Sequence, residues 1–165
     1  MRIALTTDHA GFEQLKKLQQ FLESKGHQCA NFGPAVLDST DDYPDLIAPA
    51  AKAVADGQCQ MGIIMGGSGQ GEAMVANRFK GVRAAVYYGP ATAQGAVDAD
   101  GTAADEDGLD ILRLSRQHND ANVLSLAARF LTEAQIEAAV QLWLATPFSG
   151  QERHQRRIKK LDEVV

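Results

Sequence analysis

The chain has 165 residues, 45% of them hydrophobic, and a formal net charge of −5. This length fits one globular domain with a buried core, and the negative charge argues against nucleic acid as a partner. The first residues continue directly into a strand pattern rather than a signal peptide, so we expect a cytoplasmic protein that makes no membrane contact.

The first half of the chain alternates between strand patterns and helix patterns. Residues 2–7 are predicted to form a strand, and the helix after it has an apolar face of Phe12, Leu15, Leu18 and Leu22. A weaker strand is predicted over 28–32, a helix over 44–55, and a buried strand over 60–65.

The second half continues this alternation. A helix is predicted over 71–78, and strands over 82–88 and 122–126. Thr132 and Gln135 have the spacing of a capping box at the start of a further helix. A last, basic helix is expected at about 150–162.

This alternation predicts the fold class. We expect a single α/β domain over residues 1–165, a three-layer α/β/α sandwich around a five-stranded parallel Rossmann-like sheet. Ligands of such sheets bind beyond the carboxyl ends of the strands. Asp8 and His9 follow the first strand and Gly66 ends the third, so we expect these residues to meet at one edge.

An acidic segment at about 94–112 interrupts the alternation. It contains six carboxylates and three glycines, and it lacks the aspartate spacing of a calcium-binding loop. We therefore expect a solvent-exposed insertion without a metal ion. Cys29 and Cys59 are too few for a disulfide framework or a zinc site.

The most informative motif is the loop from Gly66 to Glu72, Gly-Gly-Ser-Gly-Gln-Gly-Glu. A glycine-rich turn from strand to helix gathers backbone N–H groups around a point where an anion or oxyanion can bind. A P-loop would need Lys at position 72, and the G-x-G-x-x-G spacing of dinucleotide-binding proteins is absent. The hydroxyl of Ser68 and the carboxylate of Glu72 favour catalysis over simple binding.

Histidine and arginine side chains supply further candidates. His118 lies beside Asn and Asp just before the fifth strand, and it is a candidate for proton transfer near neutral pH. Arg153 and Arg157 share a helix face and suit a phosphate group, and Arg129 is expected to add a third cation at the sheet edge. Without a metal cluster or cofactor motif, this set suits a phosphorylated small molecule that undergoes proton transfer beside a carbonyl.

These motifs together resemble the ribose-5-phosphate isomerase B family, which includes the allose- and galactose-6-phosphate isomerases. The similar segments span almost the whole chain. They are Thr7–Phe12, Asp42–Asp45, the Gly66 loop with Ala76–Asn77, Gly81–Ala85, His118–Asn122 and Arg153–Arg157.

The resemblance implies aldose–ketose isomerisation of a sugar phosphate through an enediolate, without metal or cofactor. Ribose 5-phosphate and ribulose 5-phosphate are the expected pair. It also implies a homodimer, with a tetramer as the alternative, in which two subunits contribute to each site.

Each candidate residue receives a role from the resemblance. His118 with Asp8 would open the sugar ring, and Ser68 would assist proton movement between the oxygens. The amides of Gly67, Gly69 and Gly71 would stabilise the enediolate. Further roles are phosphate binding by His9, Arg129, Arg153 and Arg157, and lining of the pocket by Tyr43 and Asn119.

Two departures from the family pattern matter. Many members have a catalytic Cys at the position of Gly66, whereas this chain resembles the branch, typified by mycobacterial enzymes, in which a Glu is the base. Glu72 is therefore our candidate base, provided that burial raises its pKa. The acidic segment adds about twenty residues beyond the usual length of such a connection, which makes the substrate less certain than the reaction.

Two alternatives remain at this point. The same chemistry on a four- or six-carbon sugar phosphate, of the erythrulose, allose or galactose type, would preserve every catalytic assignment. A non-catalytic phosphosugar-binding protein would explain the missing Cys, although the presence of Glu72, Ser68, Asp8 and His118 together argues against it. A flavodoxin-like or receiver domain would leave the arginine residues unexplained.

Overall fold

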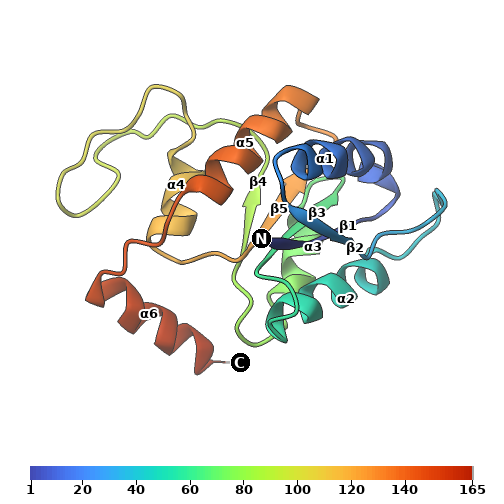
Figure 1. Cartoon of the computed structure of the whole chain (residues 1–165). Helices are drawn as coiled ribbons and strands as arrows, with labels where there is room; N and C mark the ends of the chain where they lie inside the picture. Colours follow the sequence, from blue (N-terminus) through green and yellow to red (C-terminus); the bar gives the residue numbers. More distant parts are fainter. Residues whose placement is uncertain (165) are drawn as a thin grey trace.

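The structure is a computed structural model that describes residues 1–164. Five parallel strands form one sheet in the order β2-β1-β3-β5-β4 (Figure 1). The strands are β1 Arg2–Thr7, β2 Gln28–Asn31, β3 Met61–Gly66, β4 Ala84–Tyr87 and β5 Val123–Ala127. The five predicted strands and the parallel three-layer class are confirmed, and the strand ends agree with the prediction to within two residues.

Within residues 1–164, six α-helices and one short 3₁₀ helix accompany the strands. They are η1 His9–Gly11, α1 Phe12–Ser24, α2 Tyr43–Ala55, α3 Gln70–Ala76, α4 Asp110–Gln117, α5 Glu133–Ala145 and α6 Glu152–Asp162. Helix α5 begins with the predicted capping box, in which the Thr132 side chain accepts from the Gln135 amide and the Gln135 side chain accepts from the Thr132 amide.

The sheet separates two hydrophobic clusters. One face packs against α1, α4 and α5, and its core includes Leu18, Leu112 and the fully buried Trp143. The other face packs against α2 and α3 through side chains such as Ile47 and Ala76. Successive strand residues point to opposite faces, so that Ile3 and Leu5 belong to the first cluster and Ala4 to the second.

The strand register fixes which loops share an edge. Thr7 of β1 is paired with Met65 of β3, and Gly66 of β3 is paired with Ala127 of β5. The segments that follow these three strands therefore emerge side by side at the carboxyl edge of the sheet. The predicted neighbourhood of Asp8 and the Gly66 loop is confirmed.

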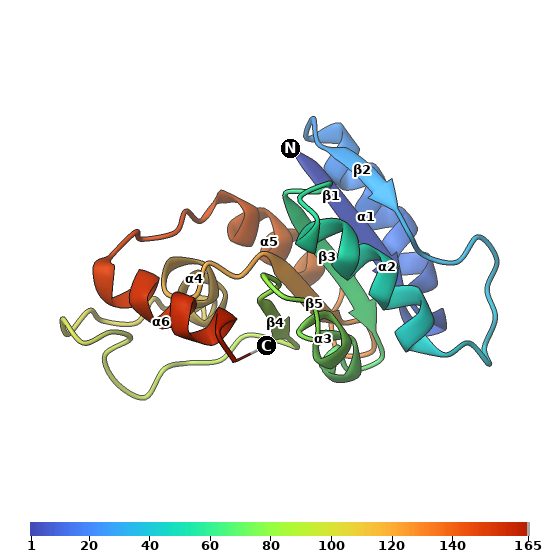
Figure 2. The ribbon, with the colours of Figure 1, turned by 90° about the horizontal axis from the view of Figure 1, so that it is seen from below.

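Helix α4 was not predicted and overlaps the segment that we expected to be an exposed acidic loop. Its first residue, Asp110, is buried, and its Oδ2 accepts from the Asp105 amide at 2.9 Å. Arg113 forms ion pairs with Asp105, Asp107 and Asp110, which offsets the repulsion between three carboxylates. The long connection before α4 and helix α6 lie at the same end of the molecule (Figures 1 and 2).

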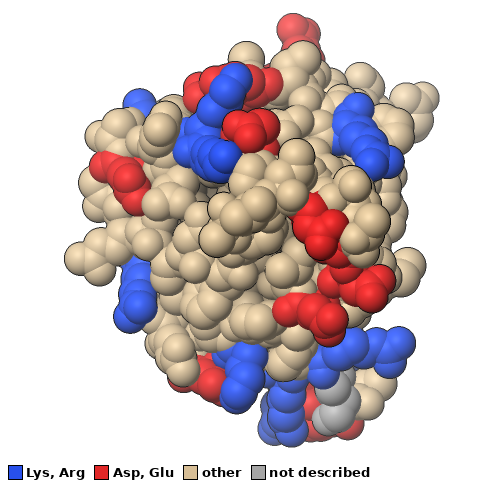
Figure 3. All heavy atoms as spheres, turned by 90° about the vertical axis from the view of Figure 1, so that its right-hand side faces the viewer, with Lys and Arg blue, Asp and Glu red and all other residues tan. Residues whose placement is uncertain are grey.

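The outer surface of the α1 and α2 side is mixed in charge. Figure 3 shows basic and acidic side chains interspersed there over a largely uncharged surface. Among residues 1–164, no helix is long and apolar enough to cross a membrane.

Candidate active site

The Glu72 carboxylate lies directly over Gly66, at the point where β3 ends. Glu72 occupies the first turn of α3 and is only 4% exposed. A Cβ atom at position 66 would overlap its carboxylate, so Gly66 leaves the space that the acid fills. Burial, and secondarily the nearby charge of Asp8, raise the pKa of Glu72 above its ordinary value. A carboxylate with a raised pKa is suited to take up and return a proton near neutral pH.

The loop between Gly66 and α3 approaches the end of β5 closely. Gly69 has a left-handed backbone with φ of 74°, and its carbonyl accepts from the buried Ser125 hydroxyl at 2.7 Å. A side chain at Gly69 would crowd both Ser125 and the Leu126 backbone. Ser68 is exposed at the tip of this loop. The loop is thus held by its glycines and Ser125 while the Ser68 hydroxyl remains accessible.

Tyr43 borders the same loop from the start of α2. A Cβ at position 71 would lie 2.8 Å from Cζ and 2.9 Å from the hydroxyl of Tyr43. The tyrosine ring therefore rests on Gly71, and Tyr43 is 37% exposed. The structure brings Tyr43 and the glycine loop together, next to Glu72.

A histidine with two charged neighbours follows Asp8 at this edge. His9 Nδ1 is 2.7 Å from Asp41 Oδ1, and Arg129 Nη2 is 3.5 Å from His9 Nε2. The hydrogen bond to Asp41 raises the pKa of His9, and the charge of Asp8 adds to this effect, whereas desolvation and Arg129 oppose it. Arg129 is held near the glycine loop because its amide donates to the Gly67 carbonyl at 3.2 Å. This corner presents an arginine and a histidine with a raised pKa, a combination that suits an anion.

Asp41 is a site residue that the sequence did not reveal. Its side chain is 10% exposed, and its second oxygen is buried without a hydrogen-bond partner within residues 1–164. The acidic run before Tyr43 was the available signal, but such a run also precedes many helices because it complements the helix dipole. The folded path of the loop between β2 and α2 is what brings Asp41 to His9.

The same corner has the donor types of a metal site. Ligand atoms of Asp8, His9 and Asp41 lie within 4.8 Å of one another. His9 Nδ1 is engaged by Asp41, however, and its Nε2 faces the positive charge of Arg129. Binding of an anion therefore suits this corner better than binding of a cation.

The remaining predicted residues lie at the opposite edge of the sheet. His118 and Asn119 precede β5, and the Gly62 amide at the start of β3 donates to the Asn122 carbonyl at 2.8 Å. The four residue steps of β5 span about 13 Å at the rise of a parallel strand. Within one chain, His118 and Asn119 are therefore separated from Glu72 by the length of the sheet.

Helix α6 joins His118 at this second edge. The rings of His118 and His154 have centroids 4.2 Å apart, and the Ser149 amide donates to the Gln117 carbonyl at 3.1 Å. Burial, together with the charge of His118, lowers the pKa of His154. Arg153 and Arg157 lie on α6, and Arg153 Nη2 is 3.0 Å from Asp100 Oδ2 of the acidic segment.

The predicted residues thus form two groups in a single chain. The first group, at the carboxyl edge, consists of Asp8, His9, Tyr43, Gly67, Ser68, Gly69, Gly71, Glu72 and Arg129. The second group, at the amino edge, consists of His118, Asn119, Arg153 and Arg157. Arg129 lies at the carboxyl edge of the sheet, where the sequence placed it, whereas Arg153 and Arg157 of the same chain lie at the other end of β5.

Comparison with known proteins defines the class of enzyme. A ribose-5-phosphate isomerase B of Mycolicibacterium paratuberculosis is 38% identical over 99% of this chain and 91% of that protein. The Clostridium thermocellum ribose-5-phosphate isomerase B structure superposes with a TM-score of 0.84 at 32% identity, covering 99% of this chain and 97% of that one. The Mycoplasma genitalium enzyme with bound ribulose 5-phosphate gives a TM-score of 0.83 at 32% identity, covering 99% and 95%. The chain is accordingly an aldose–ketose isomerase that acts on a sugar phosphate.

A family match covers nearly the whole chain. Residues 3–161 match the model described as Ribose/Galactose Isomerase. The chain belongs to this family, which confirms the resemblance drawn from its motifs.

Proposed function

We propose that this enzyme interconverts ribose 5-phosphate and ribulose 5-phosphate through an enediolate, with Glu72 as the base. The observation that carries the proposal is the buried Glu72 carboxylate, which occupies the space next to Gly66 where many relatives would have a Cys. The proton leaves C2 of the open-chain aldose for Glu72, and it returns from Glu72 to C1. No net proton is gained or lost, so a single carboxylate serves both steps.

The glycine loop supplies the groups that manage the oxygens. As C2 loses its proton, negative charge develops on O1, and the amides of Gly67, Gly69 and Gly71 are the donors proposed to stabilise it. O1 must gain a proton and O2 must lose one before the ketose forms. The exposed Ser68 hydroxyl is proposed to carry this proton between them.

Ring opening is proposed to use residues from both groups. The C1–O4 bond breaks while O1 loses a proton and O4 gains one. Asp8 and the partner subunit's His118 are proposed to act as this acid–base pair, with Tyr43 and the partner subunit's Asn119 lining the pocket.

The phosphate is proposed to lie between the cations of two subunits. His9 and Arg129 form one side, and Arg153 and Arg157 of the partner subunit form the other. The raised pKa of His9 supports this role, because a protonated imidazole attracts a phosphate dianion. Arg157→Ala is expected to raise KM more than it lowers kcat, as measured by steady-state kinetics.

We propose a homodimer, and the separation of the two groups supports it, because one chain cannot bring Glu72 and His118 to the same substrate. In a twofold dimer each site would take Glu72 from one chain and His118 from the other. Mixing inactive Glu72→Gln and His118→Ala proteins after partial unfolding should then restore about a quarter of the wild-type rate, since half of the dimers contain one intact site. Absence of any recovery, with mixed dimers detected by native mass spectrometry, would exclude shared sites.

The substrate itself is tested by steady-state rates on a panel of aldose phosphates. We expect the highest kcat/KM for ribose 5-phosphate, compared with erythrose 4-phosphate, allose 6-phosphate and galactose 6-phosphate. A clear preference for a four- or six-carbon sugar would replace the proposed substrate and retain the chemistry. Tight binding of a sugar phosphate without turnover would instead support a binding protein.

A further inference from the structure

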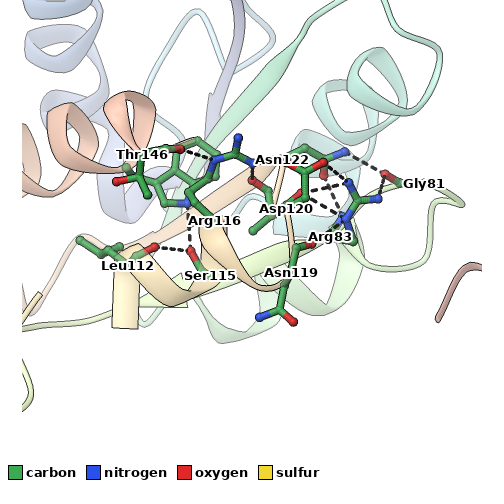
Figure 4. A network of polar contacts seen from close by, with 11 residues as sticks. Gly81, Arg83, Leu112, Ser115, Arg116, Asn119, Asp120, Asn122 and Thr146 are labelled. Atoms are coloured by element: carbon green, nitrogen blue, oxygen red, sulfur yellow. Dashed lines mark hydrogen bonds and ion pairs between the residues drawn. The ribbon is translucent and has the colours of Figure 1, made fainter. Parts of the chain in front are cut away.

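The turn that carries His118 and Asn119 has an unusual backbone at its next residue. Asp120 is the one non-glycine residue among residues 1–164 with a positive φ, 44°. Such a conformation is unfavourable for residues with a side chain, although aspartate and asparagine tolerate it best. A strained residue persists only where its surroundings hold it, and here two arginines contact it from opposite sides (Figure 4).

Arg116 holds Asp120 from the α4 and α5 side. Its Nη1 donates to Asp120 Oδ1 at 2.7 Å and to the Ala121 carbonyl at 2.6 Å, and its Nε donates to the Thr146 carbonyl at 3.2 Å. Its guanidinium lies 5.5 Å from the centre of the Trp143 ring. Because Arg116 is 7% exposed, its charge needs the carboxylate that Asp120 supplies.

Arg83 holds the same turn from the β4 side. Its Nη2 donates to the Asp120 carbonyl at 2.9 Å and lies 3.2 Å from Asp120 Oδ2, and its Nε donates to the Asn119 carbonyl at 2.9 Å. Asn122 closes the network, because its side chain accepts from the Arg83 amide and donates to the Gly81 carbonyl, both at 2.8 Å. The backbone of Asn119 and Asp120 is thus fixed on both sides.

We propose that Asp120, clamped between Arg83 and Arg116, is a positioning residue that fixes His118 and Asn119 for ring opening at the partner subunit's site. The proposal rests on the proposed function, which makes His118 a member of the ring-opening pair. The carboxylate touches no reacting atom and acts through the backbone of the turn. A displacement of about 1 Å at a catalytic group can cost about a hundredfold in rate, so a clamp of this kind controls activity without contacting the sugar.

Substitutions at position 120 separate the clamp from the backbone conformation. Asp120→Gly keeps a residue that favours positive φ but removes the carboxylate. Asp120→Asn keeps both a residue that tolerates positive φ and one side-chain oxygen that can accept from the arginines. We expect Asp120→Gly to lower kcat for ribose 5-phosphate about 10- to 100-fold. Asp120→Asn should retain most of the activity. Asp56→Gly, which removes an ion pair to Lys52 on α2, is the matched control and should turn over like wild type.

A positioning role for Asp120 is identified by comparing two reactions, only one of which needs ring opening. Ribulose 5-phosphate has no ring to open, so deuterium exchange at its C1 in D₂O needs Glu72 but not the ring-opening pair. Asp120→Gly should preserve this exchange while losing aldose turnover, as should His118→Ala. Wild-type turnover by Asp120→Gly would overturn the proposal, and so would an equal loss of both reactions together with a lower melting temperature.

A measurement on the free protein distinguishes this proposal from the proposed function. The imidazole signals of His118 in a ¹H–¹³C NMR spectrum should shift in Asp120→Gly and stay near their wild-type positions in Asp56→Gly. Unchanged His118 signals in Asp120→Gly would overturn the clamp whatever the substrate is. Absence of both turnover and exchange in wild type, with His118 signals that do shift in Asp120→Gly, would overturn only the proposed function.

Discussion

The contact between Gly66 and the Glu72 carboxylate predicts that a substitution at Gly66 will disturb the base without removing any polar atom. In Gly66→Ala, the added methyl group would occupy the space of the Glu72 carboxylate. The overlap is too large for a small adjustment, and Glu72 lies in a helix whose backbone cannot retreat without disturbing the buried Ala73 and Ala76. The carboxylate must therefore rotate away from the position above Gly66.

The size of the effect follows from the role of the base. A positioned general base contributes about 10²–10⁴-fold to rate, which corresponds to about 2.7–5.4 kcal/mol in activation free energy. We expect Gly66→Ala to lose most of this factor in kcat, and KM to change little because the phosphate-binding residues are untouched. Ala73→Gly, at the next position of the same helix, controls for general loosening of α3.

Steady-state kinetics in both directions and a crystal structure of Gly66→Ala would test this reasoning. Near-wild-type kcat, with the carboxylate still above residue 66, would refute the packing argument. Near-wild-type kcat with the carboxylate displaced would refute Glu72 as the base. In Gly66→Cys/Glu72→Ala, by contrast, the space is free for a thiol, and partial recovery relative to Glu72→Ala is expected.

Three further predictions concern charges at the site. Glu72→Gln should raise the melting temperature at pH 8 but not at pH 4. The raised pKa of Glu72 means that folding disfavours its charged form, and this cost appears only as pH rises through that pKa. Calorimetry that finds the same difference in melting temperature between variant and wild type at both pH values would contradict this. KM for the sugar phosphate should rise as pH increases through the raised pKa of His9, which Asp8 also raises and Arg129 lowers. Asp41→Asn should move this rise in KM to lower pH. An unchanged pH profile of KM would show that Asp41 does not set the pKa of His9. Asp100→Asn should lower KM by no more than about fivefold, because the exposed ion pair that competes with phosphate for Arg153 is worth about 0.2–1 kcal/mol; a higher KM would show that Asp100 assists binding.

The sequence predicted what depends on local patterns. Periodicity predicts where the five strands lie along the chain, and residue spacing predicts the capping box at Thr132. The geometry of parallel sheets predicts that Asp8 and Gly66 share an edge. A raised pKa was the condition for Glu72 to act as the base, and burial in the structure raises it. The reason that the acid fits, the space left by the missing side chain of Gly66, is visible only in three dimensions.

Features that depend on tertiary contacts were missed. Helix α4 was hidden by an aspartate-rich composition that Arg113 neutralises through three ion pairs. The partner of His9 could not be chosen among several acidic residues before Tyr43, because a loop of uncertain path separates them from the first strand. The clamp on Asp120 joins β4, α4 and the end of α5, and no sequence spacing links these elements.

Deuterium incorporation in D₂O tests the central claim most directly. Wild type and Glu72→Gln would be incubated with ribose 5-phosphate and with ribulose 5-phosphate, and carbon-bound deuterium at C2 and C1 measured by NMR. We expect incorporation by wild type and almost none by Glu72→Gln. Equal incorporation by both proteins, or wild-type turnover without any incorporation, would contradict an enediolate mechanism that uses Glu72.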